Sequence, residues 1–271
     1  MAGISLYPNR TVYVVVRLSS QIFINRVAET GRPEEVVFSP SFVQSYLWKD
    51  VMRTLRFALV AAALVVNLAN ASPTDPRVGA EYTVLAAPQP TQTTGKKIEV
   101  VEFFAYHCGA CNAFEPTLNA WIKKQGDNIV MRRIPLPFQG ASDPEARLFL
   151  TLDAMGKLEQ YHDRVFRAVH VERKRLMKDN DIIAWAAANG LDKAKFTEAW
   201  NSFGVQTKLK RLQAIAEAYK ASSTPTVVID GRYVVSPSTV QQANNIQNVG
   251  QLMTATTQTL DALVTKAAQT K

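Results

Sequence analysis

The chain has 271 residues, of which 47% are apolar and 20% are charged, so its composition is that of an ordinary globular protein with one or two domains. Its formal net charge is +8, but the basic residues form no long run interleaved with aromatic residues. A nucleic-acid-binding surface needs such a run, so we expect no nucleic-acid partner.

A pattern typical of a secretory signal peptide begins at residue 52 instead of at the start of the chain. A short positive segment is followed by ten apolar residues, 57–66, and then by Ala69-Asn-Ala71, which has the small-x-small form of a signal-peptidase site. A membrane-spanning helix would need about 20 apolar residues. We therefore expect residues 52–71 to be a signal peptide and the mature chain to begin near Ser72.

The preceding residues, 1–51, contain one strand-like run at residues 11–18 and too few apolar residues for a core of their own. We expect translation to start at Met52, so that residues 1–51 are an upstream overcall, that is, they precede the true start and are not part of the translated protein. Residues 72–95 are rich in Pro, Thr and Gln, which predicts a mobile lead-in with one short edge strand at 82–85.

The centre of the mature chain is a strand that passes into a helix. Residues 98–104 are an apolar, β-branched and aromatic run, which predicts a strand buried on both faces. From Asn112 the apolar residues recur at helical spacing, and the predicted helix reaches about Lys124 with Pro116 inside it.

The remaining pattern predicts an α/β protein with an insertion. Strands are expected at 129–134 and 226–229, and Asp230-Gly231 predicts a hairpin to 233–235. The residues between the first two strands have the periodicity of successive amphipathic helices. We therefore predict a mixed-sheet domain of residues 96–140 and 221–271, with a helical domain, 141–220, inserted between its halves.

The only two cysteines, Cys108 and Cys111, lie where the predicted strand passes into the helix. The free N–H groups and the positive dipole end of a helix N-terminus stabilise a thiolate on Cys108. A thiolate is the form that attacks disulfides. Cys111, one turn later, can close a bond with Cys108 or displace it from a mixed disulfide.

Two other interpretations of this Cys-x-x-Cys pair stay open, a structural zinc site and an inert disulfide. The chain has no second such pair, His107 is expected to project away from Cys108, and His162 and His170 are expected in a distant polar helical region. A disulfide across a two-residue spacer closes a very small loop and is usually reactive. Both interpretations are therefore less favoured than a redox pair, and we expect no metal.

Three segments carry a resemblance to a known family: Glu102-Phe-Phe-Ala-Tyr-His-Cys108, Ala199-Trp-Asn-Ser-Phe203 and Thr224-Pro-Thr-Val-Val-Ile-Asp-Gly231. Taken together they resemble DsbA, the family of periplasmic thiol:disulfide oxidoreductases, over most of residues 82–250. The resemblance implies a thioredoxin fold with an inserted helical domain, a periplasmic monomer and no cofactor.

The resemblance also implies roles for individual residues. Cys108 would be the exposed nucleophile, Cys111 its buried partner, and Pro225 a cis-proline facing the disulfide, the alternative being an ordinary trans bond. Thr224, just before it, would pair with an extended substrate segment. Glu102 resembles the family's buried acid, whose raised pKa lets it relay protons for Cys111; the alternative is a solvent-facing carboxylate.

The dipeptide between the cysteines departs from the family pattern. It is Gly109-Ala110, whereas the best-studied members have Pro-His, whose histidine stabilises the thiolate. Its absence predicts a weaker oxidant. His107 is either a partial replacement for that positive charge or a solvated loop residue, and a hydrogen bond from Thr224 to sulfur would also shift the potential.

The predicted function is disulfide donation to exported proteins with free cysteines. The electrons would then pass to a DsbB-type membrane quinone reductase, a partner that only the resemblance implies. One alternative is a disulfide reductase or isomerase of the same fold, which the Gly109-Ala110 dipeptide favours. Another is a non-catalytic peptide-binding module or metal carrier that uses the same groove.

Overall fold

The computed structural model describes residues 12–18, 21–27 and 72–271. In the first part, β1 (Val12–Leu18) and β2 (Gln21–Val27) pair as an antiparallel two-stranded sheet, of which the sequence predicts only the first strand. The expected signal peptide, residues 52–71, lies outside the described residues. Residues 72–271 belong to a separate compact unit and are considered by themselves.

This unit is built on a five-stranded mixed sheet in the order β3–β7–β6–β4–β5. The central strand β4 (Ile98–Phe104) runs parallel to β5 (Ile129–Pro135) and antiparallel to β6 (Thr226–Ile229). β6 continues through a turn into β7 (Tyr233–Val235), and β7 pairs with β3 (Tyr82–Val84) at the edge of the sheet. The predicted strands, including the edge strand and the hairpin, are therefore present.

The turn between β6 and β7 depends on Gly231. This residue has φ = +62°, a backbone conformation that residues with a Cβ rarely adopt. A Cβ there would also collide with the backbone carbonyl of Gln89. The segment 72–95 thus lies against the hairpin, and Tyr82 within it is buried. The mobility expected for this segment stays a prediction.

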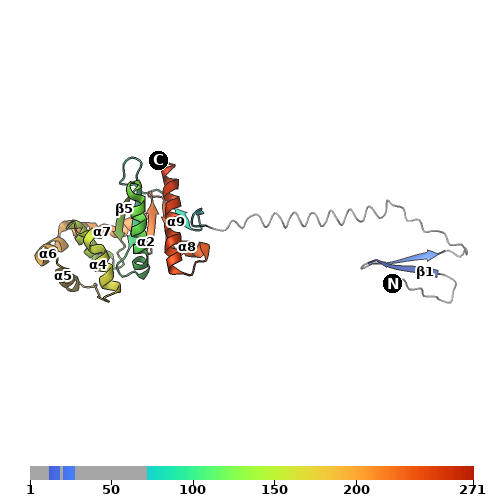
Figure 1. Ribbon diagram of the computed structural model, residues 1–271, viewed down its shortest axis with the longest axis horizontal. Helices are drawn as coiled ribbons and strands as arrows, with labels where there is room; N and C mark the ends of the chain where they lie inside the picture. Colours follow the sequence, from blue (N-terminus) through green and yellow to red (C-terminus); the bar gives the residue numbers. More distant parts are fainter. Residues whose placement is uncertain (1–11, 19–20, 28–71) are drawn as a thin grey trace. The chain divides into compact units, whose positions relative to one another are not determined.

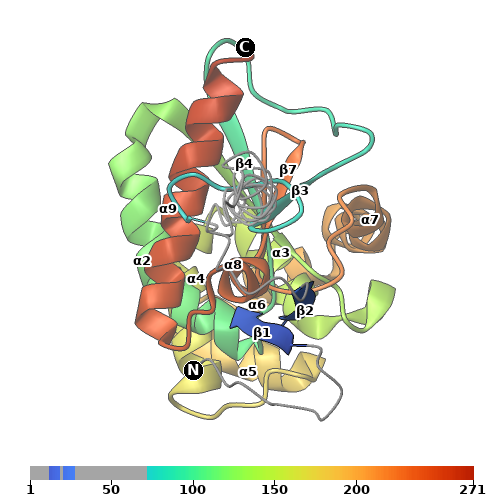
Figure 2. The ribbon, with the colours of Figure 1, turned by 90° about the vertical axis from the view of Figure 1, so that its right-hand side faces the viewer.

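Helices cover the sheet and fill the insertion. α2 (Gly109–Gln125) follows β4, α8 (Pro237–Asn244) and α9 (Val249–Ala268) close the chain, and α2 packs beside α9 (Figures 1 and 2). Between β5 and β6 lie α3 (Pro144–Ala154), α4 (Leu158–His170), α5 (Asp179–Ala188), α6 (Lys193–Asn201) and α7 (Phe203–Ala218). Among the described helices, none has the length and apolar character needed to cross a membrane.

All seven residues of β4 are buried, as the apolar run predicts. Ile98 and Val100 join a core with α2 and α9, whereas Val101 and Phe103 join a second core with the inserted helices. Successive side chains of a strand point to opposite faces of the sheet. Glu102 therefore lies on the same face as Val100, which is the face covered by α2.

The packing of α2 on the sheet can be tested with a matched pair of phenylalanines. Phe114 in α2 is fully buried in the core shared with α9, whereas Phe203 at the start of α7 is 86% exposed. Truncation of a buried Phe removes apolar contacts and leaves a cavity. We expect Phe114→Ala to lower the free energy of unfolding in chemical denaturation by about 3–5 kcal/mol. Phe203→Ala should change it by less than about 0.5 kcal/mol, and equal effects would contradict the assigned packing.

Candidate active site

The two cysteines occupy the N-terminal turn of α2. Cys108 is the N-cap residue in an extended conformation, and its Sγ accepts the backbone N–H of Cys111 at 3.2 Å. Both cysteines are free thiols in this structure. Cys108 is half-buried and Cys111 is completely buried, which is the arrangement expected of an accessible nucleophile and a shielded partner.

The surroundings of Cys108 favour its thiolate. A hydrogen bond from the Cys111 side chain is the largest cause; burial opposes it, and further hydrogen bonds come from the Thr224 side chain and from the backbone N–H groups of Cys111 and Ala110. Together they lower the pKa of Cys108 from 9.0 to about 5. Burial raises the pKa of Cys111 far above its usual value, and the neighbouring Cys108 adds to this effect. One sulfur is therefore ionised at neutral pH while the other keeps its proton.

The loop before β6 faces Cys108 from across the site. The peptide bond between Thr224 and Pro225 is cis, as the family resemblance implies, and Pro225 is buried while Thr224 is half-buried. The Cys108 thiol lies 3.4 Å from the carbonyl oxygen of Thr224. Since β6 pairs with β4, this loop lies at the end of the sheet from which α2 begins.

A cluster of three ionisable groups lies between the sheet and α2. Glu102 of β4 pairs in register with Arg133 of β5, and Glu115 lies one turn after Cys111 on α2. Arg133 Nη2 donates to Glu115 Oε1 at 2.7 Å and to Asn119 Oδ1 at 2.7 Å. Arg133 Nε is 3.2 Å from Glu102 Oε2 but is not aligned for a hydrogen bond. The guanidinium of Arg133 therefore interacts mainly with Glu115.

The two carboxyl groups of this cluster differ in their preferred charge. Complete burial and the nearby charge of Glu115 raise the pKa of Glu102 to about 8, against the opposing effect of Arg133. Burial also disfavours the charged form of Glu115, but the close approach of His162 and the charge of Arg133 outweigh it and lower the pKa of Glu115. Glu102 is thus a buried acid, and the alternative of a solvent-facing carboxylate is wrong.

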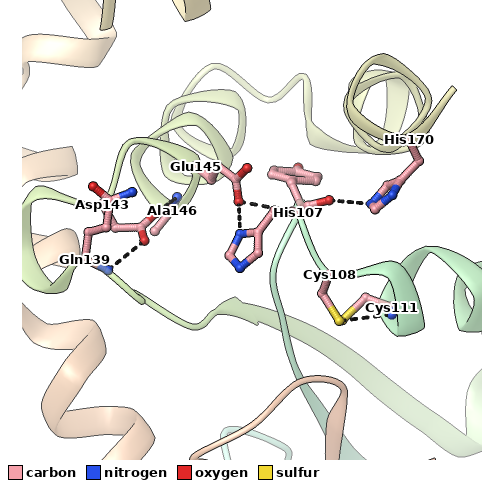
Figure 3. A network of polar contacts seen from close by, with 9 residues as sticks. His107, Cys108, Cys111, Gln139, Asp143, Glu145, Ala146 and His170 are labelled. Atoms are coloured by element: carbon pink, nitrogen blue, oxygen red, sulfur yellow. Dashed lines mark hydrogen bonds and ion pairs between the residues drawn. The ribbon is translucent and has the colours of Figure 1, made fainter. Parts of the chain in front are cut away.

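The helical insertion reaches the site through two histidines of α4. His162 lies with Nδ1 3.0 Å from the Tyr106 hydroxyl and Nε2 3.5 Å from Glu115 Oε1. His170 Nε2 is 2.7 Å from the carbonyl oxygen of Tyr106 (Figure 3). The expectation that both histidines lie in a distant polar region is therefore wrong, because α4 folds back onto the residues just before Cys108.

His107, which precedes Cys108, is held by the first turn of α3. Its Nδ1 is 2.6 Å from Glu145 Oε2, and the same oxygen accepts its backbone N–H at 3.1 Å. Figure 3 shows the imidazole turned toward Glu145 and away from the Cys108 sulfur. The hydrogen bond to Glu145 raises the pKa of His107, although partial burial opposes it. His107 is therefore a paired residue and not a freely solvated one.

Among the described residues, no group of three or more His, Cys, Asp or Glu side chains is placed to hold a metal ion. The contributions of Arg133, Glu115 and Glu145 were not predicted from the sequence. The first two had a signal, since Glu115 is four residues after Cys111 on one helical face and Arg133 is one of two adjacent charges in an otherwise apolar predicted strand. Glu145 had none, because only tertiary folding brings α3 to residue 107.

Comparison with known proteins agrees with this arrangement. Residues 99–249 match the family described as the DSBA-like thioredoxin domain. The chain belongs to the DsbA family. The thiol:disulfide interchange protein DsbA of Burkholderia cepacia is 36% identical over 205 residues, which cover 76% of this chain and 94% of that protein. The corresponding protein of Bordetella parapertussis is 39% identical over 179 residues, covering 66% and 85%.

Solved structures of DsbA proteins are similar to most of this chain. The crystal structure of Pseudomonas aeruginosa DsbA superposes with a TM-score of 0.62 at 34% identity and covers 71% of this chain and 96% of that one. The chain is therefore a thiol:disulfide oxidoreductase with a thioredoxin fold and a helical insertion. This outcome confirms the family, the fold class and the enzyme class inferred from the sequence.

The ionisation of Cys108 can be measured by following thiolate absorbance, or the rate of alkylation, against pH. We expect a midpoint near 5 in the reduced protein. Cys111→Ala removes the largest stabilising hydrogen bond and should raise this midpoint more than Thr224→Val does. A midpoint near 9 in the unmodified protein, or no change in Cys111→Ala, would contradict this account.

Proposed function

We propose that this DsbA-family protein donates disulfide bonds to exported proteins with free cysteines, through the Cys108–Cys111 pair. The observation that carries the proposal is the difference between the two sulfurs. Because the Cys108 thiolate is stabilised, the reduced enzyme is favoured and Cys108 is a good leaving group. Both effects drive electrons from the client to the enzyme.

The reaction has two exchange steps. A client thiolate attacks Cys108 Sγ of the oxidised enzyme, the bond to Cys111 breaks, and Cys111 leaves as a thiolate that takes a proton from Glu102. A second client thiolate then attacks the client sulfur of the mixed disulfide and releases Cys108 as a thiolate. The client gains one disulfide and the enzyme gains two electrons, and Glu102 then recovers its proton from water.

The loop at Thr224 and Pro225 is the proposed contact for the client backbone. Thr224 is half-buried and its carbonyl oxygen already lies within 3.4 Å of the Cys108 sulfur. An extended client segment can pair with the backbone of Thr224 by adding a strand. Such pairing would hold the client cysteine next to Cys108.

Three further residues are proposed to set the redox potential. Gly109 and Ala110 are exposed and carry no charge, so the thiolate is stabilised by the backbone N–H groups and by Cys111 and not by their side chains. His107 adds positive charge near the sulfur even though its ring is turned toward Glu145, since its pairing with Glu145 favours the imidazolium. The pair is therefore expected to be oxidising, but less so than in family members with a histidine between the cysteines.

The proposed location is the periplasm, and the proposed electron acceptor is a DsbB-type membrane quinone reductase. The signal-peptide pattern of residues 52–71 supports export, and a reactive disulfide persists in an oxidising compartment. The competing assignment is a disulfide reductase or isomerase of the same fold, which the uncharged Gly109-Ala110 dipeptide favours.

Oxidation of a reduced, unfolded protein with several cysteines tests the proposed roles of the two sulfurs. We expect Cys108→Ser to abolish the reaction, because the attacked sulfur is gone. With a disulfide-bonded client, we expect Cys111→Ala to retain client as a mixed disulfide on Cys108, detectable by non-reducing electrophoresis. The Cys108 thiolate attacks the client disulfide and releases one client thiolate, and no internal thiol then resolves the product. Activity retained by Cys108→Ser, or client attached through Cys111 in that variant, would contradict the proposal.

A further inference from the structure

We infer that His162 of the helical insertion is a positioning residue that keeps the single shared proton of the buried cluster on Glu102 instead of Glu115. The inference rests on the proposed role of Glu102 as the proton donor to Cys111. It gives the insertion a part in the chemistry of the cysteine pair, in addition to covering the site.

The cluster holds two carboxyl groups and one guanidinium group. Glu102 is completely buried and Glu115 is 5% exposed, so two negative charges beside the single charge of Arg133 would be costly. One carboxylate balances Arg133, and the other carboxyl keeps a proton. When two such groups lie in different surroundings, the surroundings decide which is the acid.

The hydrogen bonds favour charge on Glu115. Its Oε1 accepts a hydrogen bond from Arg133 Nη2 at 2.7 Å and lies 3.5 Å from His162 Nε2, a close polar contact without hydrogen-bond geometry. Both oxygens of Glu102 lack a hydrogen-bond partner among the described residues, although Arg133 Nε lies 3.2 Å away. Without the contribution of His162, the two carboxyl groups would compete for Arg133 on more equal terms.

His162 is held in the orientation that this role requires. It is 5% exposed, and its ring packs edge-on against Phe104 and Phe166, with centroids 5.0 and 5.2 Å away. The Tyr106 hydroxyl lies 3.0 Å from Nδ1. If that hydroxyl donates to Nδ1, the proton of a neutral imidazole is on Nε2 and points to Glu115.

The other charged groups that act on the cluster come from the two elements around it. Cys108 at the start of α2 raises the pKa of Glu102 when it is a thiolate, and Glu159 of α4 acts on Arg133. Neither group touches Glu115. Asn119 also favours the charged form of Glu115, but His162 is the largest of the favourable influences on it, and its loss should move the proton toward Glu115 and leave Glu102 paired with Arg133.

The test is the pH titration of the side-chain carboxyl carbons in reduced protein labelled with ¹³C glutamate. Glu102→Gln and Glu115→Gln assign the two signals. His162→Asn can still accept from Tyr106 but is too short to reach Glu115, whereas the longer amide of His162→Gln can place an N–H near the original Nε2. His170→Asn is the matched control, since His170 lies on the same helix, bonds to the backbone carbonyl of Tyr106 and stacks on Phe166.

We expect the Glu102 midpoint near 8 in the unmodified protein and a fall of about one pH unit or more in His162→Asn, with a rise at Glu115. His162→Gln should restore the unmodified values, and His170→Asn should leave them unchanged. An unchanged Glu102 midpoint in His162→Asn would overturn the inference. So would protonation of Glu115 instead of Glu102 at pH 7 in the unmodified protein, a measurement that needs no variant at position 162 to fold.

The rate of disulfide donation separates this inference from the proposed function. If the midpoints shift as expected and donation by His162→Asn weakens at a lower pH than in the unmodified protein, both stand. If the midpoints shift but Glu102→Gln donates disulfides at the unmodified rate at every pH, the assignment by His162 stands and the proposed role of Glu102 fails.

Discussion

The structure depends on the hydrogen bonds that meet at the sulfur of Cys108. Residue 108 is the N-cap of α2, so its side chain takes the place of the Ser, Thr, Asp or Asn oxygen that usually accepts an N–H of the first turn. The first N–H groups of a helix have no partners within it. A thiolate at this position accepts hydrogen bonds from them, and these bonds stabilise the thiolate. The burial of Cys111 then gives the pair its asymmetry, because only one of the two sulfurs can be ionised.

The rest of the fold holds that turn in place and supplies its proton chemistry. β4 carries the chain to the site and presents Glu102 to the underside of α2, while the inserted helices bring His162 and His170 against Tyr106. The charged cluster between the sheet and α2 therefore has partners from both the sheet domain and the insertion. This joining of the two parts explains why the insertion packs beside the cysteines and does not stand apart from them.

The sequence predicts the elements better than it predicts the contacts between them. Strand β4, helix α2 and the β6–β7 hairpin follow from apolar periodicity and from the Asp230-Gly231 turn, and the Cys-x-x-Cys spacing locates the reactive sulfur. The pairing of His107 with Glu145 and the approach of His162 to Glu115 could not be predicted. They join residues 38 and 47 positions apart, respectively, and depend on how the helices pack. The predicted location of the two α4 histidines was wrong for the same reason. A polar helix pattern does not show which residues its buried face will contact.

The central claim is that the fold makes the Cys108–Cys111 disulfide an oxidant, and its reduction potential tests that claim most directly. Equilibration with glutathione buffers of known ratio gives the value. We expect a potential above about −200 mV but below the roughly −120 mV of a strongly oxidising DsbA, because Gly109-Ala110 lacks the usual histidine. A potential near the roughly −270 mV of thioredoxin would contradict the account and favour a reductase.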